Sequence, residues 1–509
     1  MRRQSKLRHD LTQLPLFLLM LGMGTASMLV PAAYALITDQ HGASQAFFYA
    51  GLLGCVAFLL IGIAHAGRAP QEGALGPLLS LFSAFVFLPA IFAIPFVEAL
   101  PTTRYVNAYF EMLSALTTTG ATLFEDPDRL GTTLHLWRAQ VGWMGGLLMW
   151  VAAVAILAPL NLGGFEVTAQ AEPGRRETGV FTAAPLSPRE RIGRALKTLG
   201  PLYGGLTLLL WVLLMFAGQQ PLNAICHAMS VMATSGITAG GDPAAGGVIA
   251  EMVMAMFMLF ALSRLTFSSD TMTATQGGLR TDPEFRIGLC FVILVPLILF
   301  GRHFIGAYEI DAGEGTTGPI RALWGSVFTV ISFLSTTGFV SQFWSETQSW
   351  SGLGTPGLIL MGLALIGGGV ATTAGGVKLL RVFALYRNGV REMERLVHPN
   401  SVSGAGVVGR RLQSGGAYIA WIFFMLLALS FAAVTLALTL VGVSFDQALV
   451  LAVATLSTTG PLTEVGGETP IVLLSLSDTA KFILAGAMVL GRLETLAIIA
   501  LLTPDLWRS

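Results

Sequence analysis

The sequence predicts an all-α integral membrane protein, on the basis of its composition, its long apolar runs and a short loop that occurs four times. Of the 509 residues, 54% are hydrophobic and 11% are charged, less than half the charged fraction of roughly 25% in soluble domains. This composition excludes a soluble globule. Lys and Arg (29) balance Asp and Glu (29), so no net basic field indicates a nucleic-acid partner.

Ten apolar runs are long enough for helices that cross a bilayer. Hydrocarbon about 30 Å thick needs roughly 20 residues of apolar helix. The first run follows a basic stretch but is too long for a signal-peptide core and lacks a clear cleavage site, which predicts a retained helix. The predicted spans are 12–36, 46–66, 74–99, 139–160, 198–217, 248–270, 286–304, 356–385, 415–440 and 478–502.

Basic residues predict the orientation, because cytoplasmic loops carry the excess of Lys and Arg. They concentrate in the segments that a cytoplasmic N-terminus would place inside, so both termini are expected in the cytoplasm. The basic segments 172–197 and 378–411 either dock a partner or only maintain this topology. The expected inside segments are 1–11, 67–73, 161–197, 271–285, 386–414 and the C-terminal tip.

One unit recurs four times: a span, a half-length helix, a Thr-[Thr/Ser]-Gly loop and a second span. A single such loop is typical of a surface turn or a helix C-cap, but four copies in equivalent places indicate a ring. The half-length helices are expected near 105–117, 221–233, 321–335 and 445–457. The loop residues are Thr118, Thr119 and Gly120; Thr234, Ser235 and Gly236; Thr336, Thr337 and Gly338; and Thr458, Thr459 and Gly460.

Such a ring predicts a cation selectivity filter. Irregular backbone at membrane depth is tolerated where it lines a water-filled path, and inward-facing carbonyls can replace the hydration shell of an ion. Gly permits the necessary torsions, and Thr adds a hydroxyl and a stiff wall. The half-length helices would aim their negative ends at the ion. No loop supplies a carboxylate cage, so no resident metal is expected. In the fourth loop, Pro461 fixes a torsion and removes a donor.

These loops, with several further motifs, resemble the TrkH/KtrB superfamily of potassium transporters over nearly the whole chain. Two additional N-terminal spans favour the TrkH branch. The resemblance implies K+ as the transported ion, because Gly in all four loops goes with potassium selectivity, whereas Ser in the first goes with sodium permeation in plant relatives. The motifs are Trp137-Arg138, Trp143–Gly146, Gly367–Lys378, Gly491–Glu494 and Thr503–Arg508.

The expected architecture is four pseudo-repeats of helix, pore helix, filter loop and helix around a central pore, preceded by two transmembrane helices. The expected divisions are 1–70 for the N-terminal stretch and extra helices, and 71–170, 171–280, 281–400 and 401–509 for the repeats.

Two further features are candidates for a gate. A glycine-rich segment interrupts the third inner helix, since each Gly costs about 1 kcal/mol relative to Ala; close helix packing is the alternative. Arg492 lies within the last span, where an arginine is expensive unless it faces water or pairs with a carboxylate of another repeat. The resemblance implies an intramembrane loop and a positive barrier below the filter. The segment contains Gly367, Gly368, Gly369, Thr372, Thr373, Gly375, Gly376 and Lys378.

The resemblance also implies a homodimer in the bacterial inner membrane, in contact with lipid, that binds a cytosolic TrkA-like ring of nucleotide-binding regulatory subunits. No nucleotide fold occurs in this chain, so any nucleotide belongs to that partner. The expected activity is potassium uptake. A proton- or sodium-coupled symporter is the alternative, and it needs a titratable residue on the path. A polytopic membrane enzyme would need a convergent polar cluster, and the sequence suggests none.

Other charged or thiol residues near the spans have simpler expected roles. Arg264, Asp270, Asp478 and Lys481 should snorkel or pair between helices. Cys55, Cys226 and Cys290 lack the close spacing of a zinc or redox site, and core or lipid-facing positions are expected.

Overall fold

The computed structural model describes residues 16–65, 76–160, 162–165, 188–240, 243–263, 282–306, 318–398 and 414–494, and all regular structure in these ranges is helical. Seven helical stretches in them are long and apolar enough to cross a membrane, which matches seven of the ten predicted spans. They are α2 (Leu16–Ser27) with α3 (Leu29–Ile37), α4 (His41–His65), α5 (Gly76–Ala99), α7 (Thr132–Ala152) with a π-helical turn, α8 (Pro188–Phe216), α11 (Pro283–Gly306) and α17 (Ser414–Leu440).

The half-length helices lie where the sequence predicts them. Each is short and ends immediately before a Thr-[Thr/Ser]-Gly loop, so the loops begin inside the helical bundle and not at its surface. The loop threonines are all buried. These helices are α6 (Tyr105–Leu116), α9 (Pro221–Ala233), α12 (Gly318–Leu334) and α18 (Phe445–Leu456).

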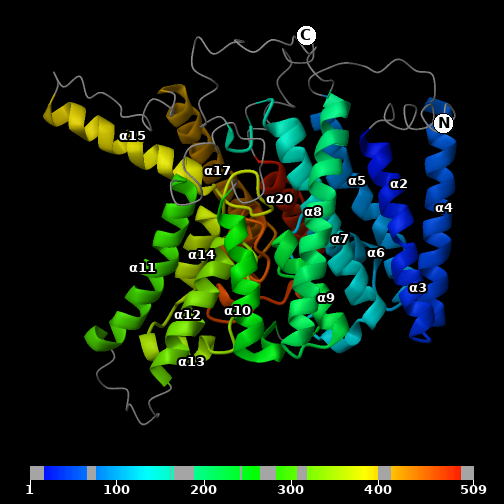
Figure 1. The fold of residues 1–509 in the computed structure, drawn as a ribbon, viewed down its shortest axis with the longest axis horizontal. Helices are drawn as coiled ribbons and strands as arrows, with labels where there is room; N and C mark the ends of the chain where they lie inside the picture. Colours follow the sequence, from blue (N-terminus) through cyan, green and yellow to red (C-terminus); the bar gives the residue numbers. More distant parts are fainter. Residues whose placement is uncertain are drawn as a thin grey trace.

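The other three predicted spans differ from continuous long helices. The span 248–270 is α10 (Gly247–Met258) followed by a 3-10 turn to Leu262, and the remainder lies outside the described residues. The span 478–502 is described only as α20 (Asp478–Leu493). The span predicted at 356–385 is not one continuous helix: α14 (Gly357–Ile366) ends at the glycines, where the sequence predicts an interruption. The chain then resumes as α15 (Leu379–Val397), which extends away from the bundle (Figure 1).

One buried tryptophan of α7 packs against both the N-terminal helix α4 and the helix α5. Trp137 of α7 is fully buried, and its ring lies 5.5 Å from the rings of both Phe47 on α4 and Phe92 on α5, edge to face. Its Nε1 donates to the carbonyl of Phe92 at 3.2 Å. Edge-to-face pairs and a satisfied indole N–H favour one arrangement, so Trp137 fixes α4 and α5 against α7.

Two inner helices approach the pore helices through glycine. If Gly145 of α7 carried a side chain, its Cβ would overlap the carbonyl oxygen of Leu116. A Cβ added to Gly491 of α20 would likewise overlap the carbonyl oxygen of Leu456. Leu116 and Leu456 are the last residues of α6 and α18. The absence of a side chain therefore lets the inner helix support the base of the filter loop in both repeats.

We predict that Gly491→Ala destabilises the protein by about 1–3 kcal/mol, since an added methyl group must push backbone apart. Gly486 is on the same helix with nothing within 4 Å of its would-be Cβ, so Gly486→Ala is the matched control. Thermal unfolding of the purified protein in detergent should show a lower midpoint for Gly491→Ala alone. Equal midpoints for the two variants would contradict this account of the helix contact.

Candidate functional site

The four loops share an unusual backbone conformation at their first threonine. The φ angles are 54° at Thr118, 52° at Thr234, 59° at Thr336 and 53° at Thr458. A β-branched residue rarely adopts the left-handed region, and it persists there only where the surroundings impose it. Four copies of this strained threonine indicate one loop geometry, repeated four times.

The loops contact one another in chain order and close a ring. A Cβ on Gly120 would overlap the Ser235 carbonyl oxygen, and one on Gly236 would overlap that of Thr337. A Cβ on Gly338 would come within 2.8 Å of Pro461 Cγ. The ring closes where the N–H of Gly460 donates to the Thr119 carbonyl at 2.6 Å. The structure therefore brings all twelve predicted filter residues together.

The fourth loop departs from the other three at its glycine. Gly120, Gly236 and Gly338 have φ of 74°, 67° and 85°, whereas Gly460 is not in the left-handed region. Pro461 follows and precedes the short helix α19 (Leu462–Val465), and a proline restricts the residue before it. The Gly460 carbonyl accepts bonds from Thr463 N and Oγ1, both at 2.9 Å. The Gly460 carbonyl is thus engaged in a helical turn.

The loop hydroxyls divide into two groups. Thr119 Oγ1 bonds with Thr117 Oγ1 at 2.9 Å, and Thr337 Oγ1 with Ser335 Oγ at 3.0 Å, so these second threonines brace the loop wall. The buried hydroxyls of Thr118 and Thr458 have no hydrogen-bond partner among the described residues. A buried hydroxyl without a partner costs free energy, and an ion in the ring would give both oxygens a partner.

Buried carboxylates that the sequence analysis missed hold the backbone beyond two of the loops. Glu111 of α6 pairs with Arg138 of α7 (Oε1 to Nε, 2.6 Å) and accepts the N–H of Leu123 at 3.0 Å. Glu251 of α10 accepts the N–H of Gln342 at 2.8 Å. The only signal in the sequence was an acidic residue within an otherwise apolar helix, which is expensive without partners.

The glycine-rich segment forms an irregular loop from Gly367 to Lys378, named the gate loop for its predicted role, which lies against the loops predicted to form the filter. Gly375 N donates to Thr336 Oγ1 at 2.8 Å, and Thr373 Oγ1 donates to the Met232 carbonyl at 3.2 Å. A Cβ on Gly375 would overlap the Ser457 carbonyl. The gate loop therefore contacts the last turn of the pore helix α9, Thr336 of the third filter loop and Ser457, the residue before the fourth filter loop.

Other bonds hold the gate loop from the opposite side. Gly369 N donates to the Ala261 carbonyl at 2.9 Å, and Val370 N to Glu284 Oε1 at 3.1 Å. Lys378 has φ of 81° and its Nζ donates to the Ala374 carbonyl. The packing is close, because a Cβ on Gly367 would overlap the Gly375 carbonyl, and Gly368 and Gly376 are similarly enclosed. These contacts explain why the segment needs glycine, and they show that it is no continuous helix.

Arg492 joins the last inner helix to the gate loop. Its side chain is buried, and Nη1 donates to the Thr373 carbonyl at 2.7 Å. Its Nε and Nη2 have no hydrogen-bond partner among the described residues. No carboxylate of the described residues forms an ion pair with this arginine. Glu494 instead pairs with Arg381 of α15 at 2.6 Å. The alternative of an ion pair for Arg492 is therefore not seen in the described part of the chain.

The remaining predicted polar residues have structural partners. Asp478 pairs with Arg104 at 2.5 Å, and Lys481 Nζ donates to Asn107 Oδ1 at 3.0 Å, which confirms the expected pairing between helices. Arg264 and Asp270 lie outside the described residues. Cys226 is buried and Cys290 exposed. Among the described residues, no cluster of His, Cys, Asp or Glu could hold a metal ion.

Comparison with known proteins agrees with this architecture. The profile of the TrkH family, described as cation transport protein, matches residues 91–507. The Trk system potassium uptake protein TrkH of Salmonella typhimurium is 31% identical over 497 residues, which cover 95% of this chain and 96% of that protein. The corresponding protein of Vibrio parahaemolyticus is 32% identical over 415 residues, with coverages of 80% and 81%.

A solved structure resembles the whole fold. The crystal structure of the potassium transporter TrkH from Vibrio parahaemolyticus matches with a TM-score of 0.81 at 27% identity, over 98% of this chain and 99% of that one. The resemblance of the motifs to this superfamily is thus confirmed by sequence and by fold. The chain belongs to the TrkH family of cation transport proteins, and is a multi-pass membrane protein.

Proposed function

We propose that this chain takes up K+ across the bacterial cytoplasmic membrane through a pore whose selectivity filter is the ring of four loops. The observation that carries the proposal is the shared left-handed threonine, followed in three loops by a left-handed glycine. The names of the TrkH relatives, which are potassium uptake proteins, support K+ as the substrate. The family is a transport family, and we expect no enzymatic activity.

The ring has the chemistry to replace the water around a potassium ion. Backbone carbonyls and the free hydroxyls of Thr118 and Thr458 are hard oxygen donors. The helices α6, α9, α12 and α18 each lead directly into one of the four loops, so their negative dipole ends lie next to the ring and favour a cation there. Ions must bind weakly enough to move on, which neutral oxygens allow better than carboxylates would.

The gate loop and Arg492 are proposed to control passage. At an effective dielectric constant near 20, a unit charge ~5 Å from a cation opposes it by about 3 kcal/mol, which slows passage roughly 100-fold. Arg492 bonds directly to Thr373, so the barrier and the loop act as one unit. A cavity of about 30 Å³, the size of one water molecule, lies beside the loop and is lined by Thr234, Thr372 and Thr373.

A regulatory partner and a second copy of the chain remain proposals. The helix α15 supports them, because it leaves the bundle (Figure 1) and exposes Met393, Leu396 and Val397 at 60%, 83% and 70%. Exposed apolar residues on a charged helix fit a protein contact. We propose that nucleotide binds to that cytosolic partner and not to this chain.

A coupled symporter is the alternative proposal. It requires a side chain on the ion path that changes its protonation or holds a second ion, and the four filter loops contain no Asp, Glu or His. Recording proton flux and sodium dependence together with potassium uptake separates the two functions.

The first prediction concerns selectivity. Gly120→Ser and Gly338→Ser should each raise sodium permeation relative to potassium several-fold, because a Cβ opposes φ of 74° and 85°. Ion fluxes into proteoliposomes give the ratio, and Gly362→Ser is the control, since its would-be Cβ has nothing within 4 Å. Unchanged ratios in both filter variants would reject the filter assignment.

The second prediction concerns topology. In a chain without its three native cysteines, Tyr386→Cys should resist an impermeant thiol reagent outside intact cells, because the 386–414 segment is expected in the cytoplasm. Tyr386 is 66% exposed and lies outside the proposed contact, so burial would not protect it once the membrane is permeabilised. Cysteines placed in the 161–197 segment should likewise resist the impermeant reagent in intact cells. Rapid labelling of either segment in intact cells would reverse the proposed orientation.

The third prediction concerns the gate. Arg492→Met should raise potassium flux by up to about 100-fold, as the barrier estimate implies, whereas Arg492→Lys should stay close to the parent. Deleting Ala371–Ala374 should also raise flux and weaken dependence on the partner. Arg321→Met is a control for loss of one exposed arginine. Flux that does not rise in either gate variant, at matched expression and retained selectivity, places the gate elsewhere.

A further inference from the structure

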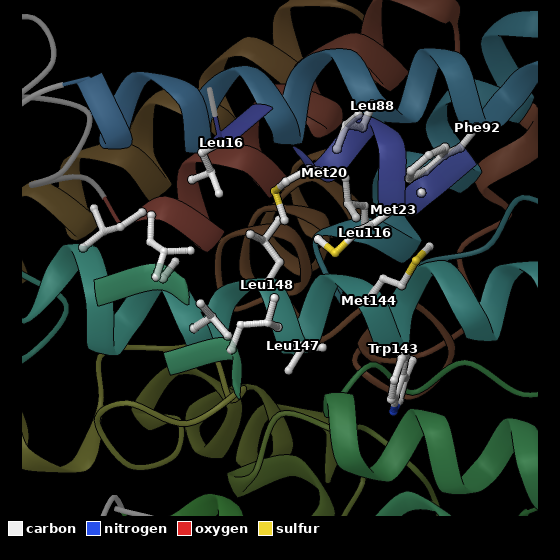
Figure 2. Close-up of a pocket in the computed structure, with 16 residues that line it drawn as sticks. Leu16, Met20, Met23, Leu88, Phe92, Leu116, Trp143, Met144, Leu147 and Leu148 are labelled. Atoms are coloured by element: carbon white, nitrogen blue, oxygen red, sulfur yellow. The ribbon is translucent and has the colours of Figure 1, made fainter. Parts of the chain in front are cut away.

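An apolar cavity of about 210 Å³ lies away from the filter ring, between α2, α5, α7 and α8. Figure 2 shows the side chains that face it, among them Met20 of α2 and Leu148 of α7. All of its lining residues are apolar or have only an indole N–H, and that of Trp143 is already bonded to Thr207 Oγ1 at 2.9 Å. The cavity therefore suits a hydrocarbon and offers no partner to a polar molecule.

The residues that line the cavity extend over a depth comparable to one bilayer leaflet. Along α7 and the π-helical turn after it they run from Trp143 to Ile156, which at 1.5 Å per residue is about 20 Å, against about 15 Å for half of the hydrocarbon core. One end reaches Leu116, the last residue of the pore helix α6. The other end reaches Ile192 and Leu196 in the first turns of α8.

The end at α8 is basic. Arg189, Arg191, Arg194 and Lys197 lie in its first turns, against one acidic residue. Arg189 is three and seven residues before Ile192 and Leu196, so it lies on the helix face that lines the cavity. Arg191 Nε is shielded from solvent and has no hydrogen-bond partner among the described residues. An anion is the complement of this end.

We propose that an anionic glycerophospholipid occupies this site, with one acyl chain in the cavity and its phosphate at the arginines of α8. Charge selects an anionic lipid over a neutral one, because a negatively charged headgroup complements the excess of basic residues at the start of α8. The chain end would contact Leu116 and Met144 at the base of the first filter loop. Binding of the lipid does not depend on which ion the protein transports. Only an effect of the lipid on ion flux would depend on the proposed function.

Trp143 provides a direct probe, because bromine on an acyl chain quenches an indole that it touches. The full chain is placed in phosphatidylcholine nanodiscs with increasing fractions of brominated phosphatidylglycerol, and the difference from Trp143→Phe isolates this residue among the nine tryptophans. We expect this share of quenching to saturate at a low fraction and to be reversed by unlabelled phosphatidylglycerol. Equal, non-saturating quenching by brominated phosphatidylcholine would overturn the proposal.

Variants test the two halves of the site separately. Leu148→Trp should fill the cavity and Arg191→Gln should weaken the basic end, and each should lower several-fold the phosphatidylglycerol that is retained after detergent washing and measured by mass spectrometry. Leu208→Trp, at a position of α8 that is 55% exposed, is the matched control and should retain it. If Leu148→Trp does not fold, the retention of phosphatidylglycerol by Arg191→Gln still tests the proposal. Equal retention in Arg191→Gln and Leu208→Trp would reject the phosphate contact.

Discussion

The structure depends on one constraint: at membrane depth, each peptide group that leaves a helix needs another partner within the protein. This chain leaves its helices in four filter loops and in the gate loop. Pore-helix carbonyls accept many of the freed N–H groups, as Ser114 does for Thr119 and Ser332 does for Thr337. Buried carboxylates accept others, since Glu111, Glu251 and Glu284 bind Leu123, Gln342 and Val370. These N–H groups of the irregular backbone thus have partners within the protein.

The same bonds tie the proposed gate to the filter. Gly375 bonds to a filter threonine, Thr373 to the end of a pore helix, and Arg492 to Thr373. If the gate loop moved aside, Thr336 Oγ1 and the Thr373 carbonyl would lose their hydrogen bonds together. Both groups would then need new partners, and water in the open cavity can provide them. The loop proposed as the gate is therefore hydrogen-bonded both to a threonine of the proposed filter and to Arg492.

The sequence predicted best those features that depend on residues close together in the chain. Loop spacing placed the pore helix at 105–117, against Tyr105–Leu116 observed, and the five glycines of 367–376 predicted the break after Ile366. What could not be predicted were contacts between distant residues. Arg138 reaches Glu111, and Glu251 reaches Gln342 across 91 positions. Neither Glu111 nor Glu251 creates a sequence pattern of its own, because the apolar residues around each one already show the periodicity of a helix.

The fourth loop shows how far the ring departs from fourfold symmetry. The Gly460 carbonyl bonds to Thr463 while the Gly460 N–H bonds to Thr119, and Pro461 contacts Gly338. A Cβ on Gly236 would lie 2.6 Å from Pro461 Cγ, although Gly236 belongs to the loop across the ring. At the level of the glycines, the fourth loop therefore reaches the opposite loop. Equivalent carbonyls from all four loops are not available there, whereas the left-handed threonines keep the fourfold pattern. Four like backbone positions are consequently found at the threonine level and not at the glycine level.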